Sequence, residues 1–262
     1  MSVRYRDISW RFLKVLHRDV VVAKRLWKVN FLVPLLEPAF YILAFGLGFR
    51  TLIGDVDYAG LKLTYVEFLA PALIASAVMW NSFFETTFGS FVRMYYQKTF
   101  DGILATPVSL EEIIVAEMVY AALRSTAAAA IMVAVLTPLG FVAFPACLLI
   151  PLVAFLGGMV FAAAGMIFTG AIPTIDMFNL PIFLFITPMF LFSSTFFPMT
   201  DVPVWGRVLS WATPLYHVVE LTRGLALGAR DSDPWVSLAY LLIASIVLGD
   251  LALRSMKRRL VK

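Results

Sequence analysis

The chain has 262 residues, of which 61% are hydrophobic and only 15% are charged. Water-soluble domains are about 45–50% apolar and about 25% charged, and a globule of this size could not bury so much apolar surface. The single Cys147 excludes an intramolecular disulfide framework, and the aromatic content of 15% excludes a disordered or low-complexity chain. These properties predict a protein whose main solvent is lipid.

Six stretches of the sequence are apolar enough to cross a bilayer, which needs about 20 residues per helix. They are residues 29–49, 64–92, 112–137, 141–170, 176–197 and 234–254. The stretches are continuous and lack the alternation of a membrane β-barrel. No internal repeat or polar linker divides them, so we predict an all-α integral membrane protein with a single six-helix domain over residues 29–262.

The net charge of +4 follows from membrane topology rather than from nucleic-acid binding. Lys and Arg gather before the first predicted span, in the loop after the second span and after the last span: Arg4, Arg6, Arg11, Lys14, Arg18, Lys24, Arg25 and Lys28; Arg93 and Lys98; Arg254, Lys257, Arg258, Arg259 and Lys262. The positive-inside rule places these segments in the cytoplasm. We therefore expect both termini to be cytoplasmic and no nucleic-acid partner.

Residues 1–28 carry charges throughout, which is unlike a cleaved signal peptide. At helical spacing they form a basic stripe and an apolar stripe: Arg11, Lys14, Arg18, Arg25 and Lys28 against Ile8, Phe12, Val15, Val22 and Leu26. The pattern predicts an amphipathic helix lying along the cytoplasmic membrane surface. The alternative is a solvated helix that only carries topogenic charge.

The cytoplasmic loop 93–111 contains a second short apolar segment. Pro107 interrupts any helix there, and Ser109 with Glu112 forms a capping box that starts the third span afresh. The segment before it, residues 97–104, consists of Gln97, Lys98, Thr99, Phe100, Asp101, Gly102, Ile103 and Leu104. A semi-apolar helix outside the bilayer indicates a docking site for a partner. The alternative is a connecting turn that folds back on the membrane.

Several motifs recur in the order and spacing of a known family. They are Gln97–Ser109 leading into Glu117, Asn30-Phe, Glu37-Pro, Phe84-Glu85-Thr, Thr187-Pro-Met-Phe-Leu-Phe-Ser, Phe196-Phe-Pro, Pro214-Leu and Leu221-Thr-Arg223. The sequence thus resembles the type-2 permease family of ATP-binding cassette (ABC) exporters over nearly its whole length. Within that family it is similar to the permeases that export lipo-chitooligosaccharide nodulation factors.

The resemblance implies a half-transporter in the bacterial inner membrane. Two permeases would pair, as a homodimer or with a related permease, and each would dock a separate ATPase through a coupling helix at residues 97–104. ATP and Mg²⁺ would bind only to that partner. The resemblance also implies a re-entrant hairpin before the last span. Residues 198–233 match it, with apolar pieces at 204–211 and 215–227 separated by Thr213-Pro214.

Motifs for catalysis on this chain are absent from the sequence. No phosphate-binding G-x-x-x-x-G-K-[ST] loop and no metal-ligand spacing occur, so we expect neither an enzyme nor a cofactor. His17 and His217 are interpreted as surface or interface residues. The run Ser193-Ser194-Thr195 is interpreted as hydrogen-bonding the end of the fifth span rather than supplying a nucleophile.

Three ionisable residues lie within predicted spans and are functional candidates: Glu37, Glu85 and Arg124. Counted from the cytoplasmic ends of their spans, Glu85 and Arg124 come within roughly two helical turns of the same depth. They can therefore pair. The pair would either neutralise buried charge or take part in transport, while Glu37 would reach the interface or a substrate path.

Aromatic residues concentrate in the fifth span and its exit. Besides Phe178 and Phe183 they are Phe185, Phe190, Phe192, Phe196 and Phe197. They would either contact lipid and neighbouring helices or form an apolar wall for a hydrophobic cargo. The leading hypothesis is export of an amphiphile such as a lipo-oligosaccharide or lipid-linked saccharide. The alternatives are drug efflux by a permease of the same family, a membrane-embedded transferase and an ion-coupled carrier.

Overall fold

The computed structural model describes residues 9–25, 28, 36, 40, 44, 54–199, 202–228 and 232–260. Within this part, five helices are long and apolar enough to cross a membrane: Tyr65–Tyr96, Leu110–Leu136, Ala146–Ala171, Ile175–Phe192 and Pro234–Leu260. They correspond to the second to sixth predicted spans. The first predicted span, residues 29–49, lies outside the described residues except at three isolated positions, and Glu37 is not among them.

The described elements are helical apart from one short hairpin. In chain order they are α1 (Phe12–Arg25), β1 (Val56–Tyr58), β2 (Leu61–Leu63), α3 (Tyr65–Phe84), the π-helical turns η2 (Glu85–Gly89) and η3 (Val92–Tyr96), α4 (Thr99–Leu104), α5 (Leu110–Leu136), η4 (Ala146–Leu149), α6 (Ile150–Ala171), η5 (Ile175–Phe178), α7 (Asn179–Pro181), the π-helical η6 (Ile182–Ile186), α8 (Thr187–Phe192), α9 (Val204–Trp211), α10 (Pro214–Leu227) and α11 (Pro234–Leu260). The two strands pair antiparallel, with Val56 opposite Leu63.

Local signals explain where several helices start. Complete capping boxes begin α3 at Thr64 with Glu67 and α5 at Ser109 with Glu112, because each side chain satisfies an otherwise unpaired amide of the first turn. Pro214 occupies the first turn of α10, where the missing amide hydrogen has no helical partner to lose. The expected starts at Ser109 and near Thr213 are thus confirmed.

The spans pack around α6. This helix contacts α3, α5, α10 and α11, and glycines on its surface let the neighbours approach. A Cβ atom built on Gly158 would lie 2.5 Å from Ser125 Oγ, and one on Gly157 would lie 2.7 Å from Val218 Cγ2. Small residues at helix contacts are typical of membrane bundles, where packing rather than hydrophobicity drives association.

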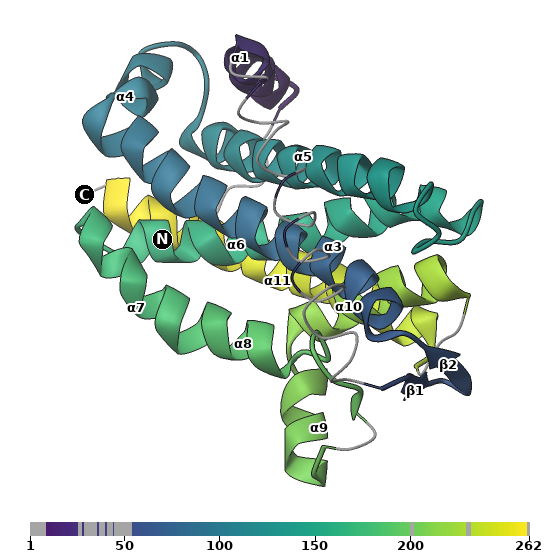
Figure 1. The fold of residues 1–262 in the computed structure, drawn as a ribbon. Helices are drawn as coiled ribbons and strands as arrows, with labels where there is room; N and C mark the ends of the chain where they lie inside the picture. The colour runs from purple at the N-terminus through teal and green to yellow at the C-terminus, as the bar shows by residue number, and fades with distance from the viewer. Residues whose placement is uncertain are drawn as a thin grey trace.

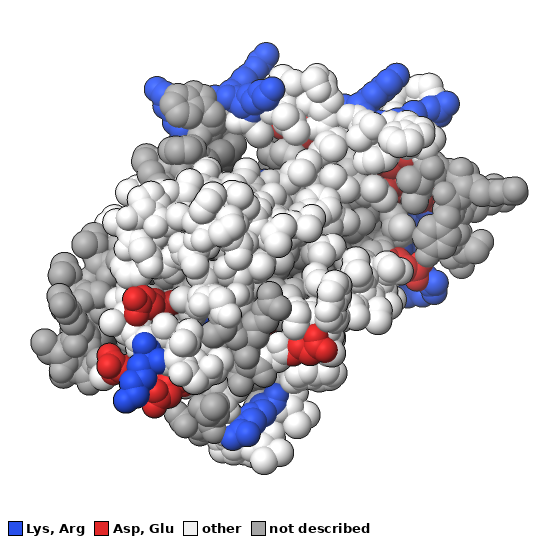
Figure 2. Space-filling model, turned by 90° about the vertical axis from the view of Figure 1, so that its right-hand side faces the viewer, with Lys and Arg blue, Asp and Glu red and all other residues white. Residues whose placement is uncertain are grey.

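The two ends of the bundle differ in what they carry (Figure 1). One end holds α4 and the C-terminal end of α11, and the opposite end holds the β1–β2 hairpin. Figure 2 faces the hairpin end and shows scattered charges within a largely uncharged surface. The basic loop and the basic C-terminal segment thus share one end, as the topology argument requires.

Some predicted boundaries need correction. The second span continues in π-helical turns to Tyr96, beyond the predicted end at residue 92, and the last span runs to Leu260 rather than to residue 254. The fourth span starts at Ala146, not at residue 141. The fifth span ends at Phe192, because Ser194 adopts a left-handed conformation (φ 59°) that a helix cannot continue through.

Candidate functional site

Four charged side chains form a network at the junction of η2, η3 and α5. Arg93 Nη1 donates to Glu85 Oε1 at 2.8 Å, and its Nε donates to Glu117 Oε1 at 3.0 Å. Arg124 donates to the other carboxylate oxygen of Glu85. Ser90 Oγ completes the set by donating to Glu117 Oε2 at 2.6 Å. Two carboxylates thus face two guanidinium groups, which is how a buried network remains neutral.

The pairing of Glu85 with Arg124 that the sequence allowed is present in the structure. Sequence reasoning missed that Arg93 and Glu117 join it. The spacing in the sequence could have shown this. Arg93 lies eight residues after Glu85, and Glu117 lies seven residues before Arg124, so Arg93 shares a helix face with Glu85 and Glu117 shares one with Arg124. Gly89 leaves room for the Glu85 carboxylate, because a Cβ atom there would lie 2.8 Å from Glu85 Oε1.

Helix α1 docks on the start of α5 close to this network. Ser9 donates from its backbone N to Glu112 Oε1 at 2.9 Å, and Arg11 Nη1 donates to the carbonyl oxygen of Pro107 at 2.5 Å. Asp19 is buried and paired with Arg18. Burial, reinforced by the negative charge of Glu117, raises the pKa of Asp19 to about 6. The docking of α1 therefore includes a titratable carboxyl.

The predicted stripes of this helix are only partly present. Val15 is buried as expected, but Val22 is 51% exposed, and Ile8 and Leu26 lie outside the described residues. The helix turns a mixed face with Val15 and Asp19 toward α5, because contact with α5 rather than with lipid covers this side. Trp10, Leu13 and Val21 remain exposed, as a membrane-surface helix would present them.

The predicted docking segment forms the short helix α4. Lys98 precedes it in a left-handed conformation (φ 53°), which reverses the chain after the span. Phe100 points inward, is 1% exposed and belongs to a buried cluster with Leu110 and Ile113. Phe100 therefore cannot contact a partner. Its role is to hold α4 against the end of the bundle.

The outward face of this segment carries a mixed set of side chains. Gln97, Lys98, Asp101 and Leu104 are exposed, whereas Thr99 and Ile103 are partly covered. Tyr95 and Tyr96, which sequence reasoning did not include, are also exposed, and the Lys98 ammonium lies 5.4 Å from the centre of the Tyr95 ring. The α4 surface, as we call it, consists of Tyr95, Tyr96, Gln97, Lys98, Asp101 and Leu104.

The aromatic residues of the fifth span do not form one continuous wall. Phe190 packs edge-on against Phe196 with ring centres 5.0 Å apart, and against Trp80 of α3 at 6.1 Å. Phe185 lies elsewhere, beside Phe168 of α6. Phe185, Phe192 and Phe197 are exposed. The structure thus joins two of the five predicted phenylalanines with Trp80, and the others face outward.

Helix α10 carries several buried polar side chains. His217 is fully buried, so of its two interpretations, as a surface or an interface residue, the first is wrong. Its ring stacks on Tyr240 with centres 4.0 Å apart, and Nε2 lies 2.9 Å from the carbonyl oxygen of Trp211. Arg223 is also buried, 3.9 Å above the Phe68 ring, and donates to the carbonyl oxygen of Ser194 at 2.8 Å.

Of the run Ser193-Ser194-Thr195, Ser193 has the helix-end role that the sequence suggested, whereas Thr195 Oγ1 is buried with no hydrogen-bond partner among the described residues. Ser193 Oγ donates to the Met189 carbonyl oxygen at 2.5 Å and lies 2.8 Å from Thr213 Oγ1. Among the described residues no group of three or more His, Cys, Asp or Glu is arranged to hold a metal ion.

Comparison with known proteins shows the family of the chain. Residues 11–227 match the ABC-2 type transporter family. The chain is 30% identical to "Nodulation protein J" of Sinorhizobium fredii (strain NBRC 101917 / NGR234) over 253 residues, which is 96% of this chain and 95% of the relative. The corresponding protein of Rhizobium leguminosarum bv. viciae is 30% identical over 97% of this chain and 96% of its own length. "Probable multidrug ABC transporter permease YbhR" of Escherichia coli (strain K12) is 26% identical over 76% of this chain and 55% of its own length.

The family match covers most of the chain, and the two nodulation proteins align along 96% and 97% of it. This chain belongs to the ABC-2 type transporter family.

Proposed function

We propose that the chain is the permease half of an ABC exporter that moves an amphiphile outward across the bacterial inner membrane, driven by a separate ATPase. The amphiphile is a lipo-oligosaccharide, a lipid-linked saccharide or a related glycolipid. The observation that carries this proposal is the α4 surface. It projects from the bundle end that holds the basic C-terminal segment, and the buried Phe100 attaches it to the spans.

The anchoring of α4 supports a role in force transmission. A partner that moves the α4 surface would also move Phe100, and with it the cluster containing Leu110 at the start of α5. The network lies just beyond: Glu85 and Arg93 are in the last turns of the span that leads into α4, and Glu117 is in α5. Motion at α4 would therefore reach two spans through rigid contacts.

The substrate part of the proposal rests on the relatives and on apolar surface. Two nearly full-length relatives are named nodulation proteins, and the resemblance implies lipo-chitooligosaccharide export. The fifth span presents Phe183, Phe185 and Phe192 outward, which suits contact with a second permease copy and with an acyl chain. A homodimer, with each copy docking one ATPase, provides two walls for a path. The proposal includes cytoplasmic termini, in line with the positive-inside rule.

The multidrug permease among the relatives supports a second candidate, the efflux of hydrophobic drugs. The decisive experiment reconstitutes the permease with its cognate ATPase in liposomes and measures ATP hydrolysis against both substrate classes. We expect stimulation by acylated oligosaccharides and none by the corresponding unacylated sugars. Stimulation by hydrophobic drugs alone would favour the second candidate, and hydrolysis insensitive to the permease would contradict both.

A further inference from the structure

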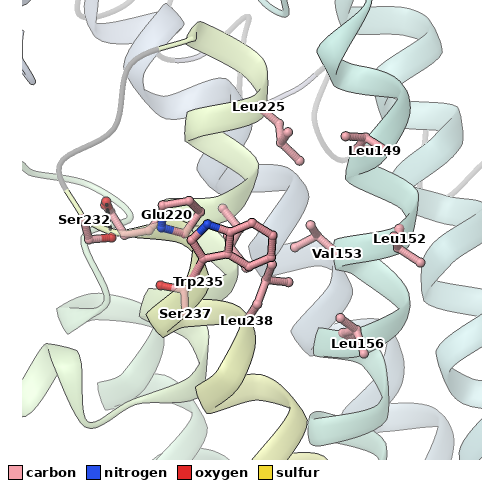
Figure 3. A pocket seen from close by; sticks show the side chains of 12 residues that line it. Leu149, Leu152, Val153, Leu156, Glu220, Leu225, Ser232, Trp235, Ser237 and Leu238 are labelled. Carbon is pink, nitrogen blue, oxygen red and sulfur yellow. Dashed lines mark hydrogen bonds between the residues drawn. The ribbon is translucent and has the colours of Figure 1, made fainter.

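A pocket of about 280 Å³ lies between α6, α10 and α11, near the bundle end that carries the hairpin (Figure 3). Leu149, Leu152 and Leu156 form one wall. Trp235 and Leu238 of α11 face them, and Leu225 of α10 lies near the top of the view. The lining is mostly apolar, which is typical of sites for hydrophobic ligands.

Polar groups gather at one side of this pocket. Glu220 Oε2 accepts from Tyr58 Oη at 2.9 Å and from Ser232 Oγ at 3.4 Å, and Ser237 lies beside them. None of the described residues that line the pocket is Lys or Arg. Arg223, 3.6 Å from Glu220, is fully buried and does not line it. Glu220 is thus paired with Arg223 on its inner side, while the pocket lining itself offers carboxylate and hydroxyl oxygens and no cation, which favours hydroxyl donors over anionic groups.

The pocket opens sideways rather than into the bundle. Leu152 is 62% exposed and Trp235 is 74% exposed, so both lie where the pocket meets the outer surface of the spans. Trp235 is in the first turn of α11, at the end opposite α4. Tryptophan at the end of a span is typical of the membrane–water interface. With the topology proposed above, the pocket faces the outer leaflet.

We propose that this pocket holds one acyl chain of an outer-leaflet amphiphile whose uncharged, hydroxyl-bearing headgroup lies against Glu220 and Ser232. The volume is just below the range of about 300–1,000 Å³ of small-molecule sites, so it takes a chain segment rather than a whole glycolipid. The leucines contact the chain, and the carboxylate accepts hydrogen bonds from the head. The inference rests on the proposed function in one respect: the membrane topology proposed there places the pocket in the outer leaflet.

The test uses the full-length permease in zwitterionic nanodiscs, without ATPase or ATP. The probe is dodecyl glucoside with a diazirine on its alkyl chain, and its counterpart is dodecyl phosphate with the same diazirine. After photolysis, we expect labelling of peptides containing residues 149–156 and 235–238. The glucoside should label them at least about fivefold more than the phosphate.

Variants separate the pocket from surrounding lipid contacts. Leu152→Trp fills the pocket and should lower this labelling at least about fivefold, with Leu156→Trp as a second filling variant. Leu148→Trp is the control, because Leu148 lies one turn before Leu152 and is exposed but does not line the pocket. Equal labelling at Ile246 on the exposed face of α11, labelling unchanged by either filling variant, or equal labelling by the phosphate would overturn the proposal. The labelling needs neither ATPase nor transport, so a failure of the liposome experiment would not change the labelling results.

Discussion

Arg93 joins Glu85 and Glu117, so the guanidinium of η3 links two carboxylates on two different spans. Glu117 is fully buried, and among the described residues it pairs with Arg93 and accepts from the hydroxyl of Ser90. Glu85 has a second cation in Arg124, which is 35% exposed. The network is therefore asymmetric, and Arg93 is the cation whose loss leaves a buried carboxylate without an opposite charge.

The first prediction compares the two arginines. Arg93→Gln should lower the free energy of unfolding by about 3–5 kcal/mol, because it strands buried charge. Arg124→Gln should cost less, about 1.5–3 kcal/mol, because it removes one hydrogen bond to a charged group while Glu85 keeps Arg93 as its opposite charge. Chemical unfolding followed by tryptophan fluorescence measures both.

The control for this comparison is Arg254→Gln, which removes an exposed pair with Asp250 and should change little. A double-mutant cycle with Glu85→Gln and Arg124→Gln tests the direct contact, and purely additive effects would show that the two side chains do not interact. If Arg93→Gln is stable but abolishes export, the network acts in transport and our structural reading fails.

The second prediction separates the two faces of α4. Gly102 is exposed, and a Cβ atom there meets nothing within 4 Å, so Gly102→Trp should leave stability unchanged. The added ring should obstruct the α4 surface and reduce the copurified ATPase at least about tenfold. Phe100→Ala should instead lower the free energy of unfolding by about 3–5 kcal/mol.

Gly54→Trp is the matched control for Gly102→Trp, since a Cβ atom on Gly54 also meets open space but Gly54 lies outside α4. The measurement is the ratio of ATPase to permease after affinity purification. Undiminished ATPase with Gly102→Trp would show that the partner docks elsewhere.

The sequence predicted those parts of the fold that depend on local signals. The hydrophobic runs located five described spans, the capping box at Ser109 located the start of α5, and Thr213-Pro214 separated α9 from α10. Each signal acts within a few residues of chain, so no knowledge of neighbouring helices was needed.

The direction of side chains was not predictable in the same way. Phe100 and Leu104 are four residues apart on one short amphipathic segment, yet only Phe100 is buried. His217 and Arg223 are buried because α10 packs among α3, α6 and α11, which no local pattern reveals. The π-helical turns at Glu85 and Val92 also arise from packing and have no simple sequence signature.

The third prediction tests close helix approach. A Cβ atom on Gly165 would lie 3.0 Å from the Phe83 carbonyl oxygen and closer still to Thr86 Oγ1. Gly165→Ala should therefore push α6 from α3 and lower the free energy of unfolding by about 1–3 kcal/mol. Gly249→Ala, with open space around it, should be neutral or slightly stabilising. Equal thermal stability of the two variants would contradict the packing.

The last prediction concerns the pH dependence of α1 docking. Asp19 has its pKa raised to about 6 by burial and by Glu117, against 3.8 for an exposed aspartate. A carboxyl with a raised pKa binds its proton more tightly in the docked state, so docking is strongest below about pH 4 and weakens as pH rises through about 6. Amide hydrogen-exchange protection of α1 should fall roughly tenfold or more between pH 5 and pH 7.5.

Asp19→Asn, which cannot ionise, should remove this dependence and keep α1 protected at pH 7.5. Asp101→Asn, on the exposed face of α4, should retain it. A pH dependence that persists in Asp19→Asn would assign the titration to another group.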